Sequence, residues 1–114
     1  KLRAARFDKA RLSLSNLARI DATGASFAEA DLKGADLTGA ILRRADFREA
    51  DLRVQTAILP DGSTRDWPVR LSFIKPQEAD FTGALIDRLL MEGVDLSGIK
   101  ADPLTLKKLA ELPV

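Results

Sequence analysis

The chain has 114 residues, of which 46% are apolar and 31% charged, enough for one globular domain with one core. Eighteen basic and seventeen acidic residues give a net charge of +1, which indicates neither a nucleic-acid binder nor a polyanion. Cysteine is absent, which excludes disulfides and thiolate metal sites, and no apolar run approaches the roughly 20 residues that a membrane span needs.

A five-residue period runs through the first half of the chain. From Ala5, ten blocks follow one another without a gap, with alanine at the first place in eight blocks and a large apolar residue at the third place in nine. A period of five fits neither the 3.6 of a helix nor the 2 of an alternating strand. Two inward residues separated by one outward residue suit a short extended segment followed by a turn. The pattern therefore predicts a solenoid with one short side per block.

A second, longer period lies inside the first. Phe7, Phe27 and Phe47 recur at every fourth block, which predicts four blocks per turn and one column of stacked rings. Each turn would then rise by the spacing between strands, about 4.8 Å. The alternative is coincidence, because phenylalanine and leucine interchange at the third place.

Four of these blocks, ADLKG, ADLTG, ADFRE and ADLRV, resemble the pentapeptide-repeat proteins, whose motif is A-(D/N)-(L/F)-x-x. The resemblance covers residues 5–54 strongly and 79–101 more loosely. It implies an all-β fold, a right-handed quadrilateral β-helix, and it is nearly silent on function.

The register slips after Val54. Residues 57–59 look like a displaced block, and 60–63 carry a strong Pro-Asp-Gly turn signal. We therefore predict repeats over 1–59, a non-repeat insertion, loop or hairpin, over 60–77, and repeats again over 78–101. Within the insertion, the alternating run 69–73 predicts a strand packed against the coil. Either the insertion folds back on the coil, which we favour, or it waits for a partner as a recognition element.

The two ends of the chain differ. Asp102 as N-cap and Pro103 at the first helical position predict a helix over 102–112, whose apolar residues are Leu104, Leu106, Leu109, Ala110 and Leu112. We expect this helix to cap the coil, and the alternative is a homodimer through the C-terminal helix, as in some members of the family. At the other end Leu2 is already in register with Phe7, so we expect the parent protein to continue upstream with more repeats or another domain.

The residue types argue against catalysis. Histidine, cysteine and tyrosine are absent, which removes the usual general acid–base groups and nucleophile pairs. The aspartates at the second place point outward, where we expect them to bind backbone amides at the corners or be solvated: Asp21, Asp31, Asp36, Asp46, Asp51, Asp80 and Asp95. No calcium-binding or phosphate-binding glycine motif is present. We predict no enzyme activity, no cofactor and no metal.

The candidate partner surface combines cations with two aromatic residues of the insertion: Arg43, Arg44, Arg48, Arg53, Lys33, Trp67 and Phe73. The alternative is a mixed, solvated face. The hypothesis is a non-catalytic protein–protein interaction scaffold, one domain of a larger bacterial protein, with the cytoplasm favoured. Its partner would be another protein or an attached domain, with no nucleic acid and no membrane span. The family resemblance also implies an alternative, a DNA mimic acting on DNA gyrase, which needs a strongly negative face.

Overall fold

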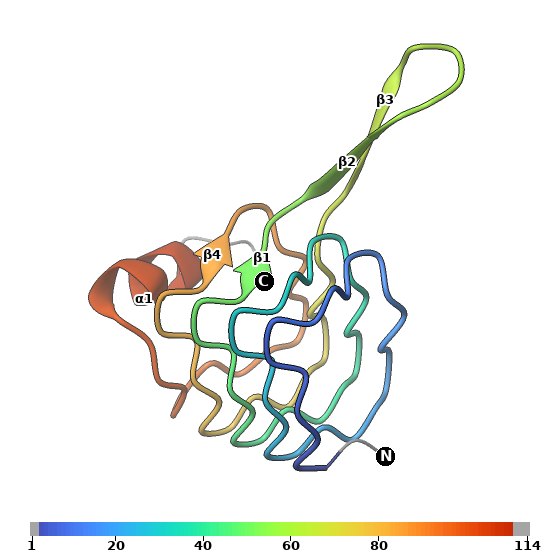
Figure 1. The fold of residues 1–114 in the computed structure, drawn as a ribbon. Coiled ribbons are helices and arrows are strands. Elements are labelled where there is room, and N and C mark those ends of the chain that lie inside the picture. The colour runs from blue at the N-terminus through green and yellow to red at the C-terminus, as the bar shows by residue number, and fades with distance from the viewer. Residues whose placement is uncertain (1–2, 111–114) are drawn as a thin grey trace.

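The computed structural model describes residues 3–110 and shows a chain wound into a four-sided coil, with a hairpin rising from one corner and a helix at the C-terminal end (Figure 1). The molecule measures 44 × 30 × 23 Å along its principal axes. The predicted positions of Leu2 and Leu112 lie outside the described residues. Within residues 3–110, no helix has both the length and the apolar character that a membrane crossing requires.

Each five-residue block forms one side of the coil, and every fourth block lies side by side in parallel with the one before it, as the longer period predicts. Ser26 shows the pattern, because it pairs with Arg6 in the turn before and with Asp46 in the turn after. The Ser26 amide donates to one neighbouring turn at 2.8 Å, and the Phe27 amide donates to the other at 2.7 Å. We number the sides in chain order: side 1 is 5–9, 25–29, 45–49 and 79–83; side 2 is 10–14, 30–34, 50–54 and 84–88; side 3 is 15–19, 35–39, 69–73 and 89–93; side 4 is 20–24, 40–44, 74–78 and 94–98.

A tight turn joins each side to the next. The amide of Ala30, the first residue of its block, donates to the carbonyl of Phe27 at 3.0 Å, and the same bond recurs around the coil. The fifth residue of the regular blocks has a φ between 55° and 79°. Together these features define a type II β-turn, whose third residue must be left-handed. Glycine takes this place in six blocks, and other residues take it at a cost of about 1 kcal/mol each.

The inward first and third places form one continuous core. Phe7, Phe27 and Phe47 stack in a single column, with ring centroids 5.4 and 5.0 Å apart, which confirms the prediction. Phe81 extends the column, 5.0 Å from Phe47. The segment from Phe47 to Phe81 contains one regular turn and, in addition, the insertion. A search at the regular spacing therefore misses the fourth ring.

The insertion spans 55–68 rather than the predicted 60–77. Arg70 pairs with Asp36 of the turn below, so residues 69–78 are two ordinary blocks, VRLSF and IKPQE, on sides 3 and 4. The predicted added strand at 69–73 is thus a side of the coil itself. Neither block carries the alanine and aspartate of the motif, although their inward residues are buried: Val69, Leu71, Ile74 and Pro76.

The insertion is an antiparallel hairpin of β2 (Gln55–Ile58) and β3 (Thr64–Trp67). Residues 57–59 therefore belong to the hairpin and are not a displaced repeat. The loop holds Pro60, Asp61 and Gly62; the Gly62 amide donates to the Leu59 carbonyl at 2.9 Å, and Gly62 has a φ of 85°. The turn signal at 60–63 is thereby confirmed as the hairpin loop.

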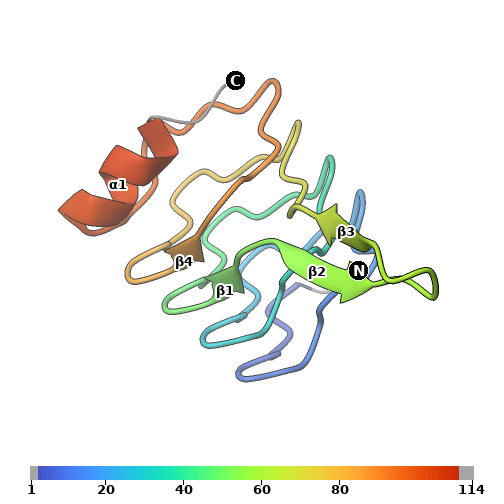
Figure 2. The same cartoon turned by 90° about the horizontal axis from the view of Figure 1, so that it is seen from above.

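The hairpin extends away from the coil, which two perpendicular views show (Figures 1 and 2). It leaves from the corner between sides 2 and 3, and residues 60–66 are all exposed. The expectation that the insertion folds back on the coil is therefore wrong. Strand pairing satisfies the backbone groups that face the partner strand, and water can reach the outward-facing ones because the hairpin is exposed.

The coil continues after the hairpin. On side 2, β1 (Asp51–Leu52) pairs in parallel with β4 (Leu85–Ile86). Phe81, Ile86 and Met91 are buried at the predicted inward places, and Leu96 is half-buried. The last turn is less regular, as its larger first-place residues predict. Arg88, at the fifth place of its block, lacks the positive φ that most other corners have.

Helix α1 (Pro103–Ala110) begins at the predicted N-cap. The Asp102 carboxylate accepts bonds from the amide and hydroxyl of Thr105, at 3.2 and 2.6 Å, and from the amide of Gly83 at 2.8 Å. The last bond ties the start of the helix to side 1. Thr105 and Leu109 are 3% exposed, and Leu109 packs into the core of the coil, whereas Leu104 and Leu106 are exposed.

Candidate functional site

The outward aspartates serve the corners of the coil. In each case Oδ1 accepts a bond from the backbone amide two residues further on, at 2.9–3.2 Å, which is an Asx turn. The residues with this bond are Asp21, Asp31, Asp36, Asp46, Asp51, Asp80 and Asp95, and Asn16 makes the same bond. The predicted backbone role of these seven aspartates is confirmed.

These bonds favour the charged carboxylates. The Thr23 hydroxyl and then the Arg3 guanidinium lower the pKa of Asp21 to about 2. Side-chain bonds from Arg48 hold the pKa of Asp46 below its usual value, against the opposing effect of partial burial. Neither carboxyl is suited to act as a general acid near neutral pH, because both stay ionised.

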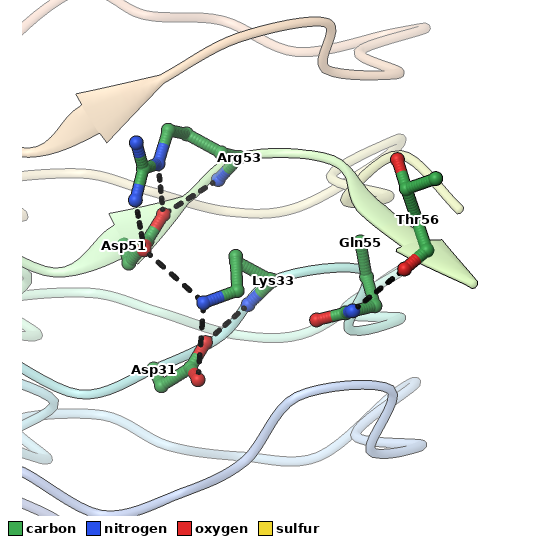
Figure 3. Close-up of polar contacts among 6 residues, drawn as sticks. All are labelled: Asp31, Lys33, Asp51, Arg53, Gln55 and Thr56. Atoms are coloured by element: carbon green, nitrogen blue, oxygen red, sulfur yellow. Dashed lines mark hydrogen bonds and ion pairs between the residues drawn. The ribbon is translucent and has the colours of Figure 1, made fainter. Parts of the chain in front are cut away.

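Side 2 carries a ladder of alternating charges (Figure 3). The Lys33 ammonium lies between Asp31 and Asp51, with Nζ–Oδ2 distances of 3.3 and 3.6 Å. The Arg53 guanidinium makes two 2.9 Å bonds to Asp51. Burial works to raise the pKa of Asp51, but bonds from Arg53 outweigh it and leave that pKa lowered. Lys33 and Arg53 are thus brought together, but their charge is largely neutralised.

The four arginines predicted as one docking face lie on three different sides. Arg43 and Arg44 are on side 4, Arg48 is on side 1 and Arg53 is on side 2. Four blocks complete one turn, so arginines close in sequence point in different directions. Arg48 is also held by its own Asp46, through Nε and Nη2 at 3.0 and 2.8 Å.

Trp67 lies at the base of the hairpin. Its side chain is half-buried, and the Arg65 guanidinium lies 4.8 Å from the ring centroid. The hairpin base also sits closely on the corner below, where a Cβ on Gly34 would come within 2.9 Å of Gln55 Cβ and 3.1 Å of the Trp67 carbonyl oxygen. Glycine at this corner therefore makes room for the hairpin.

One ion pair joins the hairpin to the turn above it. Arg88 Nη2 lies 2.7 Å from Asp66 Oδ2, and the Thr56 hydroxyl donates to the same carboxylate at 2.8 Å. Near the tip, Ile58 is 79% exposed. Sequence reasoning misses Arg88 and Ile58, because Arg88 departs from the corner pattern and Ile58 lies in a segment that resembles a repeat block.

Phe73 lies at another corner, between sides 3 and 4, so the structure does not bring it together with Trp67. Its side chain is 54% exposed and its backbone is left-handed, with a φ of 61°. The ring lies on Gly93 of the next turn, where a Cβ would come within 2.7 Å of two ring carbons.

The described surface offers little for catalysis or metal binding. No group of three or more metal-ligating side chains is assembled among residues 3–110. An open hollow of about 300 Å³ lies above Ala28, lined by Asp8, Glu29, Arg48 and Glu49. The Arg48 guanidinium in its wall is already bound to Asp46.

These features define a class of protein, a four-sided β-solenoid of five-residue repeats that displays a hairpin. Eight copies of the family model "Pentapeptide repeats" match residues 15–53. The chain belongs to the pentapeptide-repeat family, whose fold is a right-handed quadrilateral β-helix. No curated protein sequence matches it.

Several solved structures are similar. A pentapeptide repeat protein of the Arabidopsis thaliana thylakoid lumen is 22% identical over 91% of this chain and 64% of its own length, with a TM-score of 0.37. The fluoroquinolone resistance protein QnrB1 is 19% identical over 99% and 70%, with a TM-score of 0.39. HetL of Nostoc, involved in regulating heterocyst differentiation, is 21% identical over 85% and 60%, with a TM-score of 0.33. The chain thus spans less than two thirds of the Arabidopsis and Nostoc proteins.

Proposed function

We propose that the chain is a non-catalytic protein-interaction scaffold, in which the coil is a rigid mount and the hairpin β2–β3 is the part that a partner protein contacts. The observation that carries this proposal is the exposure of the hairpin, with Ile58 79% exposed and residues 60–66 all exposed. An isolated two-stranded hairpin is marginally stable in water. A protruding hairpin with an exposed isoleucine contributes little to the fold, which favours a role in recognition.

The base of the hairpin supports this role. The close fit on Gly34 and the ion pair between Arg88 and Asp66 fix the direction in which the hairpin leaves the coil. A recognition element held in one orientation loses less conformational entropy on binding than a flexible loop does. The stacked core below gives the mount its rigidity.

The ends of the coil fit the same scheme. We take α1 as a cap of the C-terminal end, because Leu109 packs into the core and Asp102 binds the Gly83 amide. A homodimer through this helix stays a prediction; Leu104 and Leu106, 61% and 43% exposed, would be its apolar residues.

The charges give no support to DNA mimicry. Such a mimic needs a strongly negative face, whereas the net charge here is +1. On side 2, moreover, Lys33 and Arg53 neutralise the aspartate column.

The test is to remove the hairpin without disturbing the coil. Deleting 55–68 joins Val54 to Val69 and gives Asp36 and Arg70 the same sequence spacing as the regular ladder pairs, such as Asp31 and Asp51. Val54 would then stand at a left-handed corner, so the deletion should carry Val54→Gly. We expect this variant to keep the far-UV circular dichroism and the cooperative melting of the parent coil.

Three proteins are then immobilised: the native chain, the deletion variant and Ile58→Ser. Each is incubated with lysate of the source organism and crosslinked, and the proteins that it retains are compared. We expect at least one protein to be retained by the native chain and lost from both variants. If folded variants retain the same proteins in the same amounts, the hairpin is not the recognition element and the proposal fails.

A further inference from the structure

A second surface lies around the corner between sides 3 and 4, away from the hairpin. Its cations are exposed, and none makes an ion pair within the part of the chain that the structure describes: Arg19, Arg43, Arg70 and Lys75. We call these four residues together with Phe73 the basic corner.

The repeat pattern explains why these cations are unpaired. Elsewhere an aspartate at the second place binds the arginine or lysine two residues on, as Asp46 binds Arg48. In the block of Arg43, Ile41 replaces that aspartate. In the next turn of the coil, the blocks 69–73 and 74–78 carry Arg70 and Lys75 at the second place. The second-place carboxylate is thus absent from three blocks around one corner, and in two of them a cation stands in its place.

The ladder pairs place these residues close together. Lys75 lies directly above Ile41, two residues from Arg43, and Arg70 lies directly above Asp36. Phe73 stands at the corner between Arg70 and Lys75. In the turn below, the Arg19 side chain lies against Gly39, and its Cγ would be 3.4 Å from a Cβ placed on Gly39.

Phe73 is an unusual residue for this place. Six corners carry glycine there, which needs no strain to be left-handed, whereas Phe73 takes a φ of 61° and leaves 54% of its side chain exposed. On the same side of the coil, Leu90, which is paired above Arg70, is 46% exposed. The corner therefore offers an apolar patch bordered by unpaired cations, a combination that the core does not require.

We propose that the basic corner binds an acidic protein segment, which rests an apolar side chain on Phe73 and sets its carboxylates against Arg43, Arg70 and Lys75. Charge complementarity selects this partner. The acidic groups around the corner, Asp21, Asp36 and Glu92, would meet a continuous phosphate backbone with repulsion, whereas a peptide can set neutral residues against them. This surface is separate from the hairpin, so it goes beyond the function proposed above.

The probe is a labelled peptide of glutamates around one phenylalanine, titrated into the isotope-labelled chain at low salt. We expect backbone amide shifts centred on 70–75 and 41–44. Two peptide controls dissect the contact: replacing every glutamate with glutamine should abolish binding, and replacing the phenylalanine with serine should weaken it. Binding should also survive in the variant that lacks 55–68, which separates this test from that of the hairpin.

Matched variants separate the site from general charge. The double change Arg43→Glu and Lys75→Glu should weaken peptide binding at least about tenfold. The control Arg11→Glu and Lys100→Glu makes the same change in net charge at exposed positions on sides 2 and 1, and should leave the affinity within about twofold. Phe73→Gly should weaken binding without lowering the melting temperature, because glycine relieves the left-handed strain.

Three results would overturn the proposal. One is the absence of amide shifts at peptide concentrations up to about 1 mM. Another is equal weakening by the two double variants, which would mean attraction by net charge alone. The third is tighter binding of a duplex or single-stranded oligonucleotide to the same residues, which would assign the corner to nucleic acid.

Discussion

Truncation of Phe47 to alanine tests the stacked column most directly. Phe47 is fully buried, with Phe27 and Phe81 each 5.0 Å away on its two faces. Removing a buried phenylalanine ring costs about 3–5 kcal/mol of unfolding free energy, and each ring–ring contact accounts for about 0.5–1.5 kcal/mol of interaction. Phe7 at the end of the column is half-buried and stacks on one ring in the described structure. Phe7→Ala should therefore cost about half as much, roughly 1.5–2.5 kcal/mol.

The assay is guanidinium unfolding of the native chain, Phe47→Ala and Phe7→Ala, followed by far-UV circular dichroism and by Trp67 fluorescence. Two probes are needed because a solenoid can lose a terminal turn before the rest unfolds. Phe47→Leu is the control for the ring alone, since leucine occupies other third places, and it should cost under about 1.5 kcal/mol. Equal losses from Phe7→Ala and Phe47→Ala would refute the reasoning that position in the stack sets the cost.

Three further predictions concern the corners and the caps. Gly24 and Gly34 both have a φ of 70°, so alanine at either should lower the free energy of unfolding by about 1 kcal/mol. Gly34→Ala also places a methyl group 2.9 Å from Gln55 Cβ at the hairpin base, so it should lower the melting temperature more than Gly24→Ala does. The hydroxyl and amide bonds to Asp102 lower its pKa to about 2. The stabilisation by this carboxylate is therefore full above the unfolded pKa of about 4 and is lost as the pH falls towards 2. Asp102→Asn should accordingly reduce the loss of melting temperature between about pH 4 and pH 2. Arg88→Ala should change global stability by under about 1 kcal/mol but speed amide exchange in the hairpin, and unchanged exchange would contradict the anchoring role of its ion pair with Asp66.

The coil could be predicted from the sequence because its rule is local and repeated. Alanine and a large apolar residue at fixed places identify each side, and the spacing of Phe7, Phe27 and Phe47 indicates four sides per turn. The sequence pattern does not identify a side of the coil where residues outside the motif fill the inward places. Leu71 and Pro76 fill inward places as well as leucine does in the regular blocks, yet their own blocks lack the motif, so the insertion was placed too late and made too long.

The candidate surface was harder to predict because it depends on which side each block occupies. Arg43, Arg48 and Arg53 are close in sequence but lie on three sides of the coil. Charge alone also misleads, because Arg53 is bound to Asp51 whereas Arg43 has no aspartate two residues before it. Lys75 and Arg70 were missed because their blocks were assigned to the insertion.

The insertion 55–68 also bears on how the chain folds. Neighbouring turns are brought together by closing segments of one regular length, except where the segment also encloses the insertion, as it does for the pairs Asp36–Arg70 and Asp51–Leu85. The insertion less than doubles the closing segment, so for a flexible chain the closure costs only about 0.5 kcal/mol more, since the entropy grows with the logarithm of length. The hairpin offsets even this when it forms early, because its strands bring Val54 and Val69 close together. Zippering from one turn to the next should therefore pass this junction with only a small delay.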